Sequence, residues 1–209
     1  MKLTSSSFED GGAIPAEFAF CAPDAKTHAT LSKNRNPQLA WSDVPIGTSS
    51  FALVCHDPDV PSRGDDVNKE GRSIPASLPR VDFFHWVLVD LPASIVGVSA
   101  GELSSTVVSR GKPGPQAAHG ARQGINDYTA WFQGDADMAG DYYGYDGPCP
   151  PWNDAIAHRY VFTVFALDVV RLTLPIRFGG KEVREAVRGH VLAQASLTGR
   201  YTLNPAVKV

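Results

Sequence analysis

Four polar side chains stand near the ends of apolar segments and could form one binding site. Asp57 follows one apolar run, His85 lies near the start of the next, and His158 begins a third run, in which Tyr160 follows two residues later. When consecutive strands pair antiparallel, the end of one lies beside the start of the next. We therefore expect Asp57 and His85 at one rim of a sheet, joined by His158 if its strand is also antiparallel.

Side-chain alternation along these runs supports the same site. His158 and Tyr160 fall on one side of their strand, and His85 shares a side with Phe83 and Val87. Two imidazoles, a carboxylate and a phenol could then converge on one pocket. The alternative is a set of separate polar groups, each satisfied by hydrogen bonds at its own strand end.

The segment 147–151, Gly-Pro-Cys-Pro-Pro, would form a rigid wall in front of His158. Proline has a fixed φ and no N–H to donate. Gly147 would allow close approach of the backbone to a ligand, and the N–H groups of Gly147 and Cys149 could bind an oxyanion. With a histidine as a further donor, this chemistry suits a phosphate, sulfate or carboxylate group. Asp57 would orient an imidazole or accept a hydrogen bond from the ligand.

The elements that position these groups are predominantly β-strands. Short apolar segments rich in Val and aromatic residues alternate with turns that contain many of the 19 Gly and 16 Pro. We expect strands over Glu17–Cys21, Gln38–Ser42, Ser49–His56, Phe83–Leu91, Thr106–Arg110 and His158–Val169. The runs 51–55, 83–89 and 160–167 are apolar on both faces, which predicts strands covered on both sides.

One segment, 179–197, carries a helical pattern. Its apolar residues recur at three- and four-residue steps, from Val183 through Val187 to Val191 and Leu192. We expect a C-terminal helix with one face on the sheet. A single late helix argues against the strand–helix alternation of a Rossmann fold.

Composition excludes several classes of function. The net charge of −3 gives no basic character that would attract nucleic acid. No run of 18 apolar residues occurs, and the N-terminus lacks a signal-peptide stretch, so we expect a cytoplasmic protein without a transmembrane segment. Cys21, Cys55 and Cys149 are odd in number and form no C-x-x-C, which predicts reduced thiols. The length fits one domain, 1–209.

Several motifs, in order, resemble those of the phosphatidylethanolamine-binding protein family. They are Asp57-Pro-Asp-Val-Pro-Ser-Arg63, His85-Trp-Val-Leu-Val89, Gly147-Pro-Cys-Pro-Pro151 and His158-Arg-Tyr-Val-Phe162. The stretch Gly124-Ile-Asn-Asp-Tyr128 is similar to the bacterial, Raf-kinase-inhibitor-like branch. The resemblance implies a β-sandwich of two antiparallel sheets in Greek-key order. It also implies a small anion pocket formed by Asp57, His85, Gly147, Pro148, His158 and Tyr160.

We therefore expect a binding or regulatory protein for a phosphate-like head group, without catalysis and without a cofactor. The resemblance further implies a kinase or protease as protein target, and a homodimer through the C-terminal region. One alternative is a hydrolase in which Cys149, or a water activated by His85 or His158, attacks an ester. A metal site formed by two histidines and Asp57 is a third interpretation, although no carboxylate follows either histidine at the usual ligand spacing.

Overall fold

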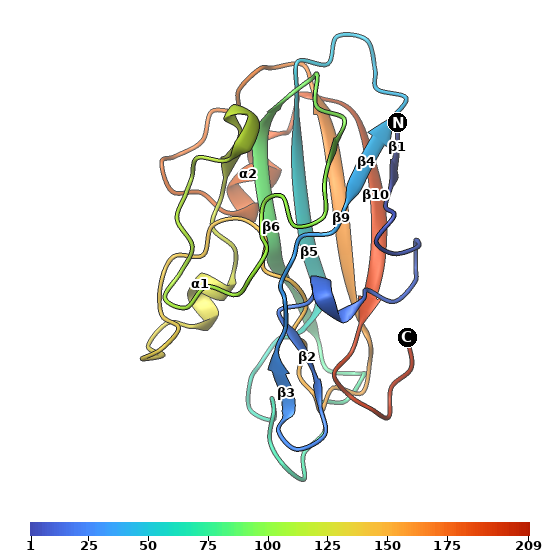
Figure 1. Cartoon of the computed structure of the whole chain (residues 1–209), viewed down its shortest axis with the longest axis vertical. Coiled ribbons are helices and arrows are strands. Elements are labelled where there is room, and N and C mark those ends of the chain that lie inside the picture. The colour runs from blue at the N-terminus through green and yellow to red at the C-terminus, as the bar shows by residue number, and fades with distance from the viewer.

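A five-stranded antiparallel sheet forms the centre of the molecule (Figure 1). The computed structural model describes residues 1–209. The sheet has the order β10-β9-β5-β6-β8, and its strands are β5 (Ser50–Pro61), β6 (Arg80–Pro92), β8 (Arg122–Gln123), β9 (His158–Leu167) and β10 (Val191–Tyr201). Every neighbouring pair is antiparallel.

A second antiparallel sheet packs on one face of the first. It has the order β1-β4-β7 and consists of β1 (Lys2–Thr4), β4 (Leu39–Ser42) and β7 (Gly97–Val98). The main hydrophobic core lies between the two sheets, where Trp41 of one meets Phe51 of the other at a ring separation of 5.3 Å. A separate hairpin pairs β2 (Cys21–Asp24) with β3 (His28–Leu31). The predicted mainly β fold with antiparallel sheets is confirmed.

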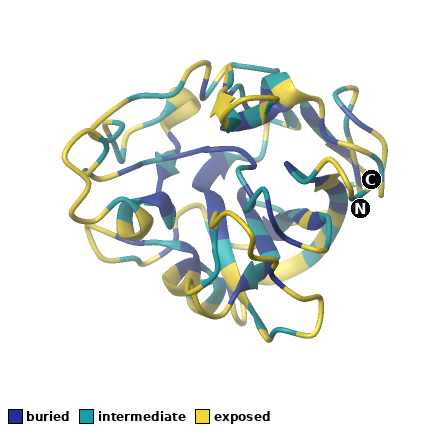
Figure 2. Ribbon diagram, turned by 90° about the horizontal axis from the view of Figure 1, so that it is seen from below, coloured by how far each residue is buried: buried dark blue, intermediate teal, exposed yellow.

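The helices are short. They are the 3-10 turns η1 (Ala16–Phe18) and η2 (Ala118–Gly120), and the α-helices α1 (Tyr128–Trp131) and α2 (Gly180–Ala186). α2 lies beside β6, and its Val183 packs in a second core on the outer face of the central sheet. β5 and β6 are therefore covered on both faces, as their continuous apolar runs predict. Buried residues concentrate in these central strands, whereas the surrounding loops are largely exposed (Figure 2). None of the helices is long and apolar enough to cross a membrane.

Four predicted strands are confirmed, with shifted ends, as β4, β5, β6 and β9. Two others are wrong. The segment Glu17–Cys21 begins in the 3-10 turn η1, bends at residues 19–20, and enters β2 only at its last residue. Thr106–Arg110 forms no strand, and Arg110 adopts a left-handed φ of 65°. Both segments have β-type composition, but neither finds a neighbouring strand over its length.

The helix expected over 179–197 is correct only in its first half. α2 ends at Ala186, a turn follows with Gly189 at a φ of 81°, and β10 begins at Val191. Glycine in the left-handed conformation is a common helix stop. After it, ten residues of β10 pair with β9, so sheet pairing determines the structure of a segment whose apolar spacing fits either period. Leu192, expected to dock on the sheet, is 43% exposed.

Candidate functional site

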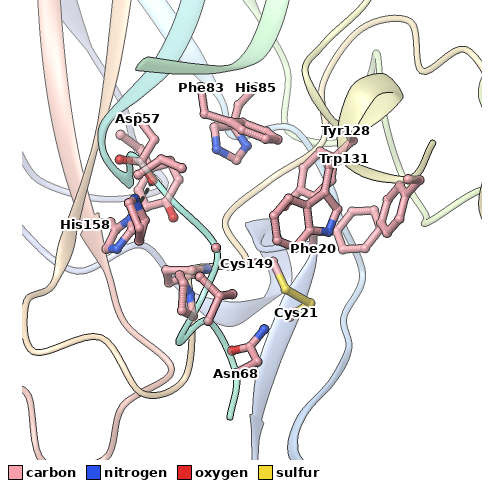
Figure 3. A pocket seen from close by; sticks show the side chains of 18 of the residues that line it. Phe20, Cys21, Asp57, Asn68, Phe83, His85, Tyr128, Trp131, Cys149 and His158 are labelled. Atoms are coloured by element: carbon pink, nitrogen blue, oxygen red, sulfur yellow. Dashed lines mark hydrogen bonds and ion pairs between the residues drawn. A yellow bond between two sulfur atoms is a disulfide. The ribbon is translucent and has the colours of Figure 1, made fainter. Parts of the chain in front are cut away.

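A cavity of about 380 Å³ opens where β5, β6 and β9 meet the hairpin β2–β3 and the loop before β9. Asp57, His85, His158 and Tyr160 all line it, so the strand-rim geometry expected for these four residues is observed. Figure 3 shows Asp57 and His158 on one side of the cavity and aromatic side chains on the other. These aromatic residues are Phe20, Phe83, Tyr128, Trp131 and Phe132.

His85 reaches the cavity from a β-bulge in β6. The residues on either side of it, Phe84 and Trp86, pair with successive residues of β5, so His85 is an extra residue in the ladder. The bulge reverses the alternation of side chains along the strand. Phe83 and His85 line the cavity, but Val87 packs in the core on the opposite face. The expectation that His85 and Val87 share a side is therefore wrong.

His158 lies between two carboxylates. Its Nδ1 is 2.7 Å from Asp57 Oδ2, and its Nε2 is 3.1 Å from Asp154 Oδ2. Arg80 in turn donates two hydrogen bonds to Asp154, at 2.5 and 3.0 Å. Burial would lower the pKa of His158, but the hydrogen bonds to Asp154 and Asp57 outweigh it and raise the pKa to about 9. His158 is thus a cation at neutral pH, in a row of alternating charges that runs from Asp57 to Arg80.

His85 has a different environment. Its Nδ1 lies 2.7 Å from the carbonyl oxygen of Asp146, which can only accept a hydrogen bond. Nδ1 therefore carries the proton in the neutral ring, and Nε2 presents a lone pair without a hydrogen-bond partner in the protein. Burial lowers the pKa of His85 to about 4, even though the nearby Asp57 charge opposes the shift. His85 is neutral at physiological pH.

The loop that contains Asp146 and contacts His85 is fixed in place by the Asp146 carboxylate, which is buried. Asp146 accepts hydrogen bonds from Asn34 at 2.6 Å and Asn126 at 2.7 Å, and Lys112 Nζ lies at 3.0 Å. Burial raises the pKa of Asp146, and Lys112 opposes that shift. The backbone N–H of Asp146 also donates to the carbonyl of His85 at 3.0 Å. Backbone and side-chain contacts together therefore fix the His85 ring and its tautomer.

Tyr160 carries a buried hydroxyl without a partner. Its oxygen is inaccessible to solvent and meets no partner at hydrogen-bonding geometry, although the Asp57 carboxylate lies close enough to contribute to its raised pKa. Burial raises the pKa of this phenol well above its usual value, so the hydroxyl keeps its proton. The Tyr160 ring packs edge-on against His85, with 5.0 Å between ring centroids. Two neighbouring residues of the cavity wall thus each have an unused polar atom.

Gly147 and Pro148 do not line the cavity, contrary to the position that the resemblance implies. The N–H of Gly147 donates to Asn34 Oδ1 at 2.8 Å, so it is not free for a ligand. A Cβ on Gly147 would lie 2.1 Å from the Phe18 carbonyl oxygen, so glycine is required by protein packing. The wall consists of the next three residues, Cys-Pro-Pro, in which only Cys149 has an N–H, and that N–H makes no hydrogen bond.

Cys149 forms a disulfide with Cys21, at a Cα separation of 4.9 Å. The prediction of three reduced thiols is therefore wrong for these two, whereas Cys55 is free and buried. The partners are 128 residues apart and belong to no local motif, so only the fold reveals them. With its sulfur in a disulfide, Cys149 offers no thiolate for the hydrolase alternative.

Neither histidine is well placed to bind a metal ion or to activate a water molecule. Both ring nitrogens of His158 already bond to carboxylates, so His158 presents no lone pair to a metal shared with His85. No group of three or more metal-binding side chains is placed to hold an ion. His85 has a free Nε2, but a group with a pKa of about 4 is a weak base at neutral pH.

Sequence reasoning missed the residues that support the site. Asp154 and Arg80 complete the charged row, and Asp146 fixes His85. Tyr128 and Trp131 belong to the aromatic wall. The only available signal for the wall was the density of aromatic residues in the long loop before His158.

Comparison with known proteins identifies relatives over nearly the full chain. A family model described as phosphatidylethanolamine-binding protein matches residues 4–202. YbhB of Escherichia coli is 31% identical over 202 residues, covering 97% of this chain and 100% of YbhB. A protein of Aquifex aeolicus is 33% identical, covering 96% of this chain and 88% of its own length.

Two solved structures are similar in fold. The crystal structure of Escherichia coli YbcL, described as a member of the mammalian PEBP family, aligns with a TM-score of 0.67 and 25% identity, over 96% of this chain and 97% of YbcL. CT736 of Chlamydia trachomatis, described as a PEBP homologue, aligns with a TM-score of 0.63 and 28% identity, over 96% of this chain and 95% of its own.

Proposed function

Because this chain belongs to the phosphatidylethanolamine-binding protein family, we propose that it binds a small anionic head group in the cavity and does not transform it chemically. The observation that carries the proposal is the pair of unused polar atoms on the cavity wall, the Tyr160 hydroxyl and His85 Nε2. Buried polar groups without partners are rare in folded proteins. A ligand oxygen that lay beside His85 and drew the Tyr160 hydroxyl toward the cavity would satisfy both.

Each donor has a distinct part in this binding. The Cys149 N–H can donate directly, because it makes no hydrogen bond within the protein. The Tyr160 hydroxyl, which solvent does not reach in the free protein, donates after a small shift of its side chain exposes it to the cavity. His85 must first gain a proton at Nε2, since its only proton is committed to Asp146. His158 does not touch the ligand in this scheme but holds Asp57 in place. Binding of one anion is therefore accompanied by uptake of one proton.

Charge balance supports this coupling. In the free cavity, the negative charge of Asp57 is matched by His158, and neutral His85 adds nothing. A lone anion would place uncompensated charge in a buried site, which is costly. Protonation of His85 supplies the missing positive charge beside the ligand.

Titration calorimetry with sulfate and with phosphorylethanolamine tests the proposal. Sulfate keeps its charge near neutral pH, so any pH dependence of its affinity comes from protonation of the protein and not of the ligand. We expect sulfate affinity to rise about tenfold for each pH unit between about pH 8 and about pH 6. The variant His85→Gln should lose this pH dependence, and Tyr160→Phe should bind about fivefold more weakly through loss of one hydrogen bond.

The control variant is His119→Gln, which alters a surface histidine that pairs with Glu102 outside the cavity. It should bind as the wild type does. If the wild type binds neither ion, the proposed function is overturned. If it binds sulfate with the same affinity at every pH, the role of His85 as the proton acceptor is wrong.

A kinase or protease target, a homodimer and a cytoplasmic location stay predictions. They follow from the resemblance and from the sequence composition, and the description of the cavity does not depend on them. Native mass spectrometry of the purified protein measures the dimer directly.

A further inference from the structure

The disulfide lies on the cavity wall. Cys21 and Cys149 both line the cavity, and Figure 3 shows the bond between Phe20 and Asn68. The two residues are not equally accessible. Cys21 is 7% exposed at the start of β2, whereas Cys149 is only partly buried. Of the two residues, Cys149 is therefore the more accessible to a small molecule that enters the cavity.

The segment that carries Cys149 has few other attachments. Its own N–H makes no hydrogen bond, and the two prolines that follow have no N–H. The nearest backbone hydrogen bonds are to the carbonyl of Pro148 on one side and to the carbonyl of Pro151 on the other. The Cys21 N–H of β2 donates to the carbonyl of Pro148, and beyond that residue the disulfide is the one bond that ties Cys149 to β2. Cys149 can therefore move when that bond opens, while the flanking backbone stays anchored.

We propose that the Cys21–Cys149 disulfide is a thiol-exchange site, at which a low-molecular-weight thiol enters the cavity and forms a mixed disulfide with Cys149. The thiol is a separate molecule from the anion, and the inference does not depend on anion binding. The volume of about 380 Å³ is large enough for a compact thiol.

The exchange conserves atoms and electrons. The incoming thiolate attacks Cys149 Sγ, the Cys149–Cys21 bond breaks, and Cys21 leaves as a thiolate that takes a proton from water. The product carries the thiol's sulfur on Cys149 and a free thiol on Cys21. A second molecule of the thiol then attacks the mixed disulfide, which releases a symmetric disulfide and leaves both cysteines reduced. The electrons for this reduction come from the two thiols.

Access decides which sulfur is attacked. Thiol exchange depends on reach as well as on the thiolate fraction of the attacking group. Both cysteines line the cavity, but Cys149 is the less buried of the two, so a group attached to it by exchange would occupy the cavity. Attack on Cys21 would require the new group to fit beside a nearly buried strand residue. The adduct is therefore expected on Cys149.

Mass spectrometry of the folded protein incubated with cysteamine tests the proposal. We expect one cysteamine adduct, located on Cys149 by peptide mapping, at urea concentrations well below the unfolding transition. A brief pulse of iodoacetamide at each urea concentration alkylates the free, buried Cys55 only if the protein unfolds, and so reports on any unfolding. The exchange rate should not change with low urea, because no global opening is required. Absence of exchange until the protein unfolds, or an adduct on Cys21, would overturn the proposal.

A matched pair of single variants compares how accessible each cysteine is when no disulfide is present. Cys21→Ser leaves Cys149 as a free thiol, and Cys149→Ser leaves Cys21. With cystamine as the probe, Cys149 should react at least about tenfold faster than Cys21. Equal rates would contradict the cavity route. Circular dichroism of both variants confirms that each is folded before its rate is compared.

Discussion

On the β9 side of the cavity, His158 lies between two carboxylates, whereas on the β6 side His85 donates to a backbone carbonyl and keeps one ring nitrogen free. Both rings are buried, and burial alone lowers the pKa of each. The charged partners reverse the shift only for His158, so its pKa rises to about 9 while that of His85 falls to about 4.

The difference separates a structural role from a binding role. A histidine with both nitrogens committed maintains the shape and charge of the cavity but has nothing left for a ligand. A histidine with one free nitrogen and a low pKa can change its charge when an anion arrives. Residue type and proximity to the cavity do not distinguish these roles, because the distinction lies in the atoms that each ring contacts.

The largest expected effect is the loss of stability in His158→Leu. This change leaves Asp57 buried with no cation beside it, and Asp154 with Arg80 alone. We expect the free energy of unfolding to fall by about 3 to 5 kcal/mol in urea denaturation. The control His190→Leu breaks an exposed pair with Asp168 and should cost less than about 1 kcal/mol. Equal losses in the two variants would show that the buried row of charges has no special importance.

The next effect is alkaline destabilisation of the wild type. The folded-state pKa of His158, about 9, lies above the ordinary value of 6.5. Folding is therefore favoured by this group below the ordinary pKa, and that contribution is lost as pH rises through about 9. We expect the unfolding free energy to decline by on the order of 3 kcal/mol as the pH rises from 6.5 to about 9. Denaturation at a series of pH values measures it, and His158→Leu should lack this part of the slope.

The smallest effect on stability is expected at Tyr160, which belongs to β9 and packs its ring against His85. Tyr160→Phe removes a hydroxyl that has no partner, so the unfolding free energy should change by less than about 0.5 kcal/mol or increase. The control Tyr145→Phe removes a hydroxyl that donates to the Phe18 carbonyl at 2.6 Å, and should cost about 1 to 3 kcal/mol. A large loss in Tyr160→Phe would mean that its hydroxyl is already satisfied in the free protein.

The sequence was sufficient to predict the central strands and the meeting of four site residues. β5, β6 and β9 could be identified because their runs are apolar on both faces, and antiparallel pairing then places Asp57, His85 and His158 at one rim. Alternation along β9 also placed His158 and Tyr160 on one side correctly.

The features that were missed depend on contacts between distant segments. The bulge at His85 arises from the register of β6 against β5, which no local pattern in β6 encodes. The disulfide requires Cys21 and Cys149 to be brought together by the fold. The residues of β10 fit a helical period as well as an alternating one, and pairing with β9 selects the strand.

The anchoring of Asp146 also has a consequence for the kinetics of folding. Its carboxylate joins side chains from three other segments, and Asn34 is 112 residues away in the sequence. Contacts of such long range require large loops to close, and they slow folding. We expect the central hairpin β5–β6 to form earlier, and the loop that orients His85 to be among the last parts to become native. Newly made chains would then acquire their sheet before they acquire a working cavity.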